Sequence, residues 1–142
     1  MQGLFQSTRN TLPSPSESVP LILAIDDDLE VRRLLRHHLE AAGYRVATAE
    51  DAVAAGHSVV DHRPDLIIAD FKMPYMNGND FIGLLRADDT MPNIPVLFIT
   101  SRQTSAELVG RTFGFPLLTK PLDVDDLLAT VKALLRVELR GI

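Results

Sequence analysis

The stretch PDLIIADFKMPYMNG, residues 64–78, joins the pattern of a buried strand to an acidic ending. Its apolar run, residues 66–69, stops at Asp70, and the chain then turns through Pro74 toward Gly78. Aspartate is a poor strand former and costs free energy when it is buried without a partner. An acid at the end of an apolar strand therefore indicates a site that uses its carboxylate.

Outward from this stretch, apolar runs of strand length alternate with helical patterns. The runs are residues 21–25, 44–49, 66–69, 95–99 and 115–118. The first, third and fourth runs are apolar without alternation, which is typical of strands that are covered on both faces. Strands that alternate with helices in this way predict an α/β fold with a parallel sheet.

Capping residues set the limits of the first helix that we expect, and a proline sets the end of the second. Asp28 is placed to cap the start of the first helix, and Gly43 to end it. The second helix should run from about Asp51 to His62, because the following Arg63 precedes a proline. Apolar residues of the first helix recur at helical spacing, at Val31, Leu34, Leu35, Leu39 and Ala42.

Three further helices are expected along the rest of the chain. The third should carry Phe81, Leu84 and Leu85 on one face, and the fourth should cover about residues 104–112. The last should begin behind Asp123, which suits an N-cap. Its apolar stripe is Val124, Leu127, Leu128, Val131, Leu134 and Leu135.

Composition narrows the class of protein. The chain has 142 residues, 46% of them hydrophobic, and a net charge of −5, which argues against a nucleic-acid surface. With no cysteine, it cannot form a disulfide framework or a thiolate metal site. No apolar run approaches the roughly 20 residues that span a bilayer, and no secretory signal is visible, so we expect a cytoplasmic protein without membrane contact. Residues 1–20, rich in Ser, Thr and Pro, should form a flexible tail.

Polar side chains follow the strand candidates at the points where the strands end. The acids of residues 26–28 follow the first run, Asp70 the third, Thr100 the fourth and Lys120 the fifth. Ligands of parallel sheets bind at the carboxyl ends of the strands. These side chains should therefore form one site.

Clustered carboxylates of this kind indicate a divalent cation. They repel one another unless a cation joins them, and Mg²⁺ prefers carboxylate oxygens and water. With the metal in place, Asp70 can stay ionised and attack a phosphoryl group. Mg²⁺, the Thr100 hydroxyl and the Lys120 ammonium can then each hold one phosphoryl oxygen.

The pattern resembles the receiver domain of two-component response regulators, relatives of the chemotaxis regulators. The matching segments are LILAIDDD (21–28), DLIIADFKMPYMNG (65–78), IPVLFITS (94–101) and LLTKP (117–121). The resemblance implies a flavodoxin-like doubly wound sheet of five parallel strands, in the order 2-1-3-4-5, with five helices. It covers residues 21–137 and leaves residues 138–142 as a C-terminal end.

The resemblance also implies a role for each site residue. Asp70 would be the phosphoacceptor, and Asp26 and Asp27 the metal-binding acids, with the backbone carbonyl of Lys72 as another ligand. Thr100 would be the switch hydroxyl. Lys120 would pair with phosphate, and its bond to Pro121 would be cis.

The same resemblance implies partners. A sensor histidine kinase or a histidine phosphotransfer protein would donate the phosphoryl group, and a downstream protein would read the result. The domain would catalyse only its own phosphorylation and dephosphorylation. Leu117 departs from the family, which usually has an aromatic residue three positions before the lysine, so the usual coupling between threonine and aromatic ring is in question.

Two other functions are compatible with these residues. A phosphatase of the haloacid dehalogenase type also has Asp-x-Asp after a strand, and Asp26 would then be the residue that is phosphorylated. Glu30 stands where that class has Thr or Val, which speaks against it. A degenerate receiver that acts as an unphosphorylated scaffold is the third interpretation.

Overall fold

The computed structural model describes residues 19–103 and 110–140, and gives the backbone alone for residues 137–140. The elements, in chain order, are β1 (Leu21–Ile25), α3 (Leu29–Ala41), β2 (Arg45–Ala49), α4 (Ala52–His62), β3 (Leu66–Asp70), α5 (Gly78–Ala87), β4 (Val96–Thr100), β5 (Leu117–Thr119) and α7 (Val124–Arg140). Each strand agrees with its predicted range within two residues. Within these ranges, no helix is both long and apolar enough to cross a membrane.

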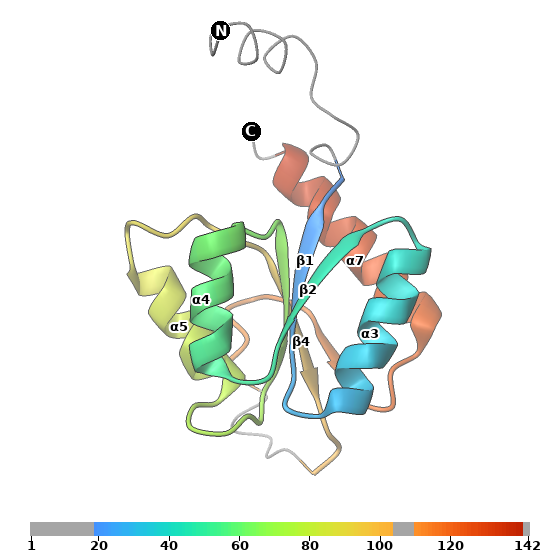
Figure 1. Ribbon diagram of the computed structural model, residues 1–142, viewed down its shortest axis with the longest axis horizontal. Coiled ribbons are helices and arrows are strands. Elements are labelled where there is room, and N and C mark those ends of the chain that lie inside the picture. The colour runs from blue at the N-terminus through green and yellow to red at the C-terminus, as the bar shows by residue number, and fades with distance from the viewer. Residues whose placement is uncertain (1–18, 104–109, 141–142) are drawn as a thin grey trace, which may run out of the picture.

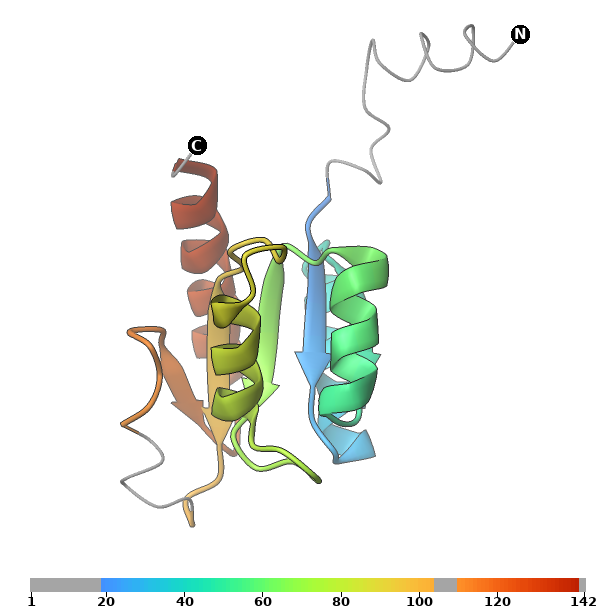
Figure 2. The same ribbon diagram turned by 90° about the vertical axis from the view of Figure 1, so that its left-hand side faces the viewer.

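The five strands form one parallel sheet in the order β2-β1-β3-β4-β5. Helices α3 and α7 cover one face, and α4 and α5 cover the other, as Figures 1 and 2 show. The predicted doubly wound fold is therefore confirmed. The described ranges contain four of the five expected helices. Most of the fourth, residues 104–109, lies outside them, and residues 110–112 at its end are not helical.

The central strands are apolar up to their last residues because both of their faces are buried. Leu23, Ile25, Ile67 and Ala69 face the side of α4 and α5. Their neighbours in the chain, among them Ile22 and Ile68, pack on the side of α3 and α7. Strands β3 and β4 are buried at every position. The sheet thus has a core on each side, which fixes its strand ends firmly.

Aspartates cap three helices, two of them, Asp28 and Asp123, as the sequence predicts. The side chains of Asp28, Asp51 and Asp123 accept hydrogen bonds from backbone amides two or three residues on, at 2.9 to 3.0 Å. At the other end of α3, Gly43 has a φ of +99°, a conformation that glycine adopts without strain. These caps fix where each helix begins and so hold the loops that follow β1 and β5.

The apolar face that we expected for α5 is partly wrong. Phe81 is buried as predicted and Leu85 is half-buried, but Ile82 is 1% exposed whereas Leu84 is 59% exposed. Residues three and four apart share a helix face, so Phe81, Ile82 and Leu85 turn toward the sheet together with Gly78. Leu84 is two residues past Ile82 and therefore points to the opposite side.

This assignment predicts unequal effects of two substitutions on α5. Ile82→Ala should lower the free energy of unfolding by about 2 to 5 kcal/mol, because it leaves a cavity in the core. Leu84→Ala, the matched control on the same helix, should change it by less than about 0.5 kcal/mol. Urea denaturation measures both, and equal losses would contradict the assignment.

Candidate functional site

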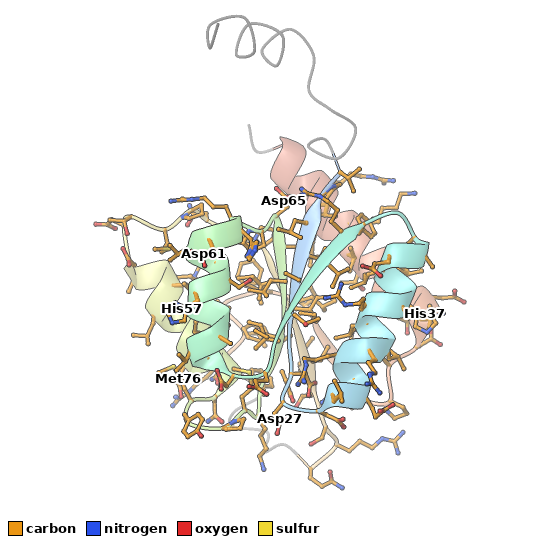
Figure 3. All side chains as sticks on the ribbon, viewed as in Figure 1. Asp27, His37, His57, Asp61, Asp65 and Met76 are labelled. Carbon is orange, nitrogen blue, oxygen red and sulfur yellow. The ribbon has the colours of Figure 1, made fainter. Side chains whose placement is uncertain are left out.

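The register of the sheet brings the ends of four strands to one edge. Ile25 lies opposite Ala69, Asp70 opposite Ile99, and Thr100 opposite Thr119. The next residues along β1 and β5 are Asp26 and Lys120. The labelled side chains of Figure 3 show this edge at Asp27, whereas Asp65 lies at the opposite end of the sheet.

Three acids meet at this edge. Asp26, Asp27 and Asp70 each offer a carboxylate oxygen, and these oxygens all lie within 4.8 Å of one another. Asp26 is 0% exposed and Asp70 is 4% exposed, whereas Asp27 is open to solvent. The Asp26 carboxylate accepts a hydrogen bond from the Asp28 amide at 2.9 Å. Two of the three acids are thus buried, and the cluster is open to solvent at Asp27.

The ammonium of Lys120 bridges the two buried acids. Its Nζ lies 2.8 Å from Asp26 Oδ2 and 3.1 Å from Asp70 Oδ2. The lysine backbone is fixed as well, because its amide donates to the Thr100 carbonyl at 2.7 Å, and the bond to Pro121 is cis as expected. Burial lowers the pKa of Lys120, but the hydrogen bonds and charges of the two acids outweigh burial and raise it. Lys120 therefore stays protonated.

The surroundings of Asp70 alter its ionisation. Its pKa rises from the ordinary 3.8 to about 6, first because of burial and second because of the negative charge of Asp26. Lys120 and the Lys72 amide, which donates to Asp70 Oδ1 at 3.3 Å, act in the opposite direction. A carboxylate with a raised pKa in such a cluster is typical of a functional site.

Comparison with known proteins decides the family. The family model of the response regulator receiver domain matches residues 22–132, which is most of the chain. The chain belongs to the response regulator receiver family. Members of this family are signalling domains of two-component phosphorelay systems, as the sequence resemblance implied.

Two curated response regulators illustrate the relationship. The chain is 40% identical over 120 residues to the DNA-binding dual master transcriptional regulator RpaA of Synechocystis, and 40% identical over 117 residues to the response regulator MprA of Mycobacterium leprae. These alignments cover 83% and 81% of the chain but 50% of each relative. The receiver described here therefore spans about half the length of the curated relatives that it matches.

Solved receivers have the same fold. The chemotaxis protein CheY4 of Vibrio cholerae is 32% identical, with a TM-score of 0.72 over 82% of this chain and 99% of that chain. A CheY-like receiver domain protein of Methanospirillum hungatei is 26% identical, with a TM-score of 0.78 over 88% of this chain and all of its own.

The acid cluster of this receiver fits Mg²⁺. Among the described residues, one ammonium group, that of Lys120, contacts two of its three carboxylates, so negative charge is in excess when all three are ionised. The oxygens are hard donors, and the solvent-facing side leaves room for the waters that Mg²⁺ retains. Receiver domains generally bind Mg²⁺ at an acidic pocket of this kind.

The remaining predicted residues lie next to the cluster. Thr100 is buried at the end of β4, where its hydroxyl donates to the Ser101 carbonyl at 3.3 Å. Lys72 is exposed in the loop after β3, two residues from Asp70. The structure thus places every predicted residue at this one edge of the sheet, with the Thr100 hydroxyl turned to the carbonyl of the next residue, Ser101.

Gly78 shapes the site in a way that the sequence did not reveal. Its amide donates to the Phe71 carbonyl at 2.9 Å, which folds the loop back against β3. A Cβ at this position would collide with the carbonyl oxygen of Asp70. Glycine is therefore required by close approach, and the sequence marked it only as part of a turn.

The raised pKa predicts how pH affects the metal-free protein. Because the folded-state value of Asp70, about 6, exceeds its ordinary 3.8, the folded state holds the proton more tightly. The stability contributed by Asp70 is fully present below about pH 3.8 and is lost as pH rises through about 6. Asp70→Asn cannot titrate, so the wild type should lose stability relative to this variant over that window.

Urea unfolding at a series of pH values in the presence of a chelator measures this difference. Parallel pH profiles for the wild type and Asp70→Asn would show that the Asp70 pKa is not raised.

Proposed function

We propose that this receiver accepts a phosphoryl group on Asp70 in a Mg²⁺-dependent reaction. One observation carries the proposal: Asp70 is a buried carboxylate at the end of a central strand, with two further acids within 4.8 Å and an ammonium 3.1 Å from its Oδ2. A nucleophilic carboxylate, a cation site and a fixed positive charge are the parts that phosphoryl transfer needs.

The donor in this reaction is a phosphohistidine of a sensor histidine kinase or a histidine phosphotransfer protein. A carboxylate oxygen of Asp70 forms a bond to phosphorus while the phosphorus–nitrogen bond breaks, and the imidazole leaves with the electron pair and is protonated. Asp26, Asp27, Asp70 and the Lys72 carbonyl would hold Mg²⁺, which supplies positive charge against the phosphoryl oxygens. The acceptor needs no separate base, since it is already ionised.

Lys120 and Thr100 then bind the product. A phosphoryl group on Asp70 brings new anionic oxygens close to Nζ of Lys120, which now contacts Asp26 and Asp70. The ammonium can exchange a carboxylate for a phosphoryl oxygen. The Thr100 hydroxyl can turn from the Ser101 carbonyl to another, because a hydroxyl rotates freely about its bond.

The phosphorylated state signals to a downstream protein. The alignments cover only half of RpaA and of MprA, so DNA binding is a property of RpaA that we do not transfer to this chain. For this domain we keep the expectation of protein contacts without a nucleic-acid surface, given the net charge of −5. Its own phosphorylation and dephosphorylation are the reactions that we assign to it.

Transmission to that protein should start at Lys120 rather than at an aromatic ring. Leu117 is half-buried in β5, opposite Phe98, and packs against the core on the side of α4 and α5. An aliphatic side chain cannot reproduce the swing of a ring between buried and exposed positions. The Lys120 amide is hydrogen-bonded to the Thr100 carbonyl, so movement of either residue should shift the ends of β4 and β5 together.

Asp70→Asn should abolish phosphorylation. Acetyl phosphate with Mg²⁺ should add one phosphoryl group to the wild type and none to the variant, because an amide is not a nucleophile. Intact-mass spectrometry measures the modification. Asp61→Asn, an exposed acid on α4, is the control and should be labelled like the wild type.

The same experiment tests the phosphatase alternative, which the family match does not support. A phosphatase of that class would carry the phosphoryl group on Asp26. Peptide mapping that located it there, or undiminished labelling of Asp70→Asn, would refute our assignment. A wild-type chain that is never labelled would favour the scaffold interpretation.

Lys120→Ala should leave Mg²⁺ binding in place but remove the structural change that follows phosphorylation. Removal of the ammonium takes away a cation that competes for Asp26 and Asp70, so Mg²⁺ binding should be retained or become tighter. With beryllofluoride, amide signals of residues far from the active-site edge should shift in the wild type. In the variant, only the signals of residues near Asp70 should shift. An unchanged long-range shift in Lys120→Ala would remove the lysine from the switch.

A further inference from the structure

Arg32, on the first turn of α3, contacts the backbone of the acid cluster. Its Nη1 donates to the carbonyl oxygen of Asp26 at 2.8 Å, and its side chain is half-buried. The other two arginines of α3, Arg33 and Arg36, pair with glutamates of the same helix at 3.4 and 3.1 Å. Of these three arginines, Arg32 is therefore the one that reaches the site.

The position of Arg32 in the helix requires a compensating interaction. Helix α3 begins at Leu29, and the N-terminus of a helix carries partial positive charge. A cation in the first turn is therefore unfavourable unless other groups attract it. The Asp26 carbonyl and the adjacent acids supply that attraction, so the site, rather than the helix, accounts for a guanidinium at this position.

The contact fixes the peptide bond between the two metal-binding acids. The Asp26 carbonyl and the Asp27 amide belong to one planar unit, so an anchored oxygen sets the orientation of the whole plane. Asp26 is also held by its amide, which donates to Ala49 at 3.1 Å, and it is fully buried. Asp27 is exposed and lacks that packing. The direction in which its side chain leaves the backbone thus depends on the plane that Arg32 holds.

We propose that Arg32 is a positioning residue for the metal site, which orients Asp27 relative to Asp26 and Asp70 through the Asp26 carbonyl. This inference rests on the proposed function of the acid cluster. It makes a prediction opposite in sign to simple electrostatics. As a nearby positive charge, Arg32 would repel a divalent cation, and its removal would tighten binding. As a positioning residue, its removal weakens binding.

Magnesium titrations of the full chain test the direction of the change in Mg²⁺ affinity. Amide chemical shifts report the binding. Arg32→Gln should bind Mg²⁺ roughly tenfold to hundredfold more weakly than the wild type, the range typical when groups that orient metal ligands are lost. Arg33→Gln is the matched control, because it removes the same charge from the next position without a contact to Asp26. Its affinity should equal that of the wild type or be slightly higher.

Equal or tighter binding by Arg32→Gln would overturn the inference. If that variant does not fold without Mg²⁺, Arg32→Lys takes its place under the same criterion, because lysine keeps the charge but not the planar fork of donors. A wild type that binds no Mg²⁺ would overturn the proposed function and this inference with it. If the wild type binds Mg²⁺ and the variant binds it with the same affinity, the inference about Arg32 fails and the proposed function stands.

Discussion

The site depends on two buried carboxylates, those of Asp26 and Asp70, that share the ammonium of Lys120. Burial and the negative charge of Asp26 both disfavour the ionised form of Asp70 and raise its pKa to about 6. Buried charges persist in proteins when they are paired and hydrogen-bonded. Here the pairing is incomplete because Asp27 adds a third carboxylate within 4.8 Å. The excess of negative charge in the cluster therefore favours a further cation.

The fold makes this arrangement possible because a parallel sheet gathers strand ends at one edge. Strands β1 and β3 are neighbours, so their terminal acids lie side by side, and β5 brings Lys120 from beyond β4. Cores on both faces of the sheet hold these ends in place. Asp70 and Thr100 are the last residues of their strands, and Asp26 and Lys120 directly follow theirs, so the packing of the sheet keeps the distances between them short. Asp70 therefore contacts the Lys120 ammonium, and the Lys120 amide in turn donates a hydrogen bond to the Thr100 carbonyl.

Much of this could be predicted from the sequence, because the deciding signals are local. Apolar runs of strand length located the strands, Asp28 and Asp123 marked two of the helix caps, and the rule for parallel sheets collected Asp26, Asp70, Thr100 and Lys120 at one edge. The face of α5 was predicted less well. Phe81 and Leu85 are compatible with either Leu84 or Ile82 at helical spacing, and the position of the sheet, which periodicity does not report, selects Ile82.

The features that the sequence did not reveal are contacts between backbone and distant groups. Gly78 is required because its Cα approaches the Asp70 carbonyl, and Arg32 matters through the carbonyl of Asp26. Neither contact leaves a pattern of spacing or polarity, because a main-chain acceptor is present at every residue. The pKa of Asp70 likewise depends on burial and on a neighbour 44 positions earlier in the chain, and both follow from the tertiary structure alone.

A crystal structure of the chain with Mn²⁺ and beryllofluoride would test the central claim most directly. Anomalous scattering should place one metal ion among the carboxylates of Asp26, Asp27 and Asp70, with beryllofluoride on Asp70 and the Lys120 ammonium in contact with fluorine. A metal bound elsewhere, or Lys120 still bridging Asp26 and an unmodified Asp70, would contradict the account.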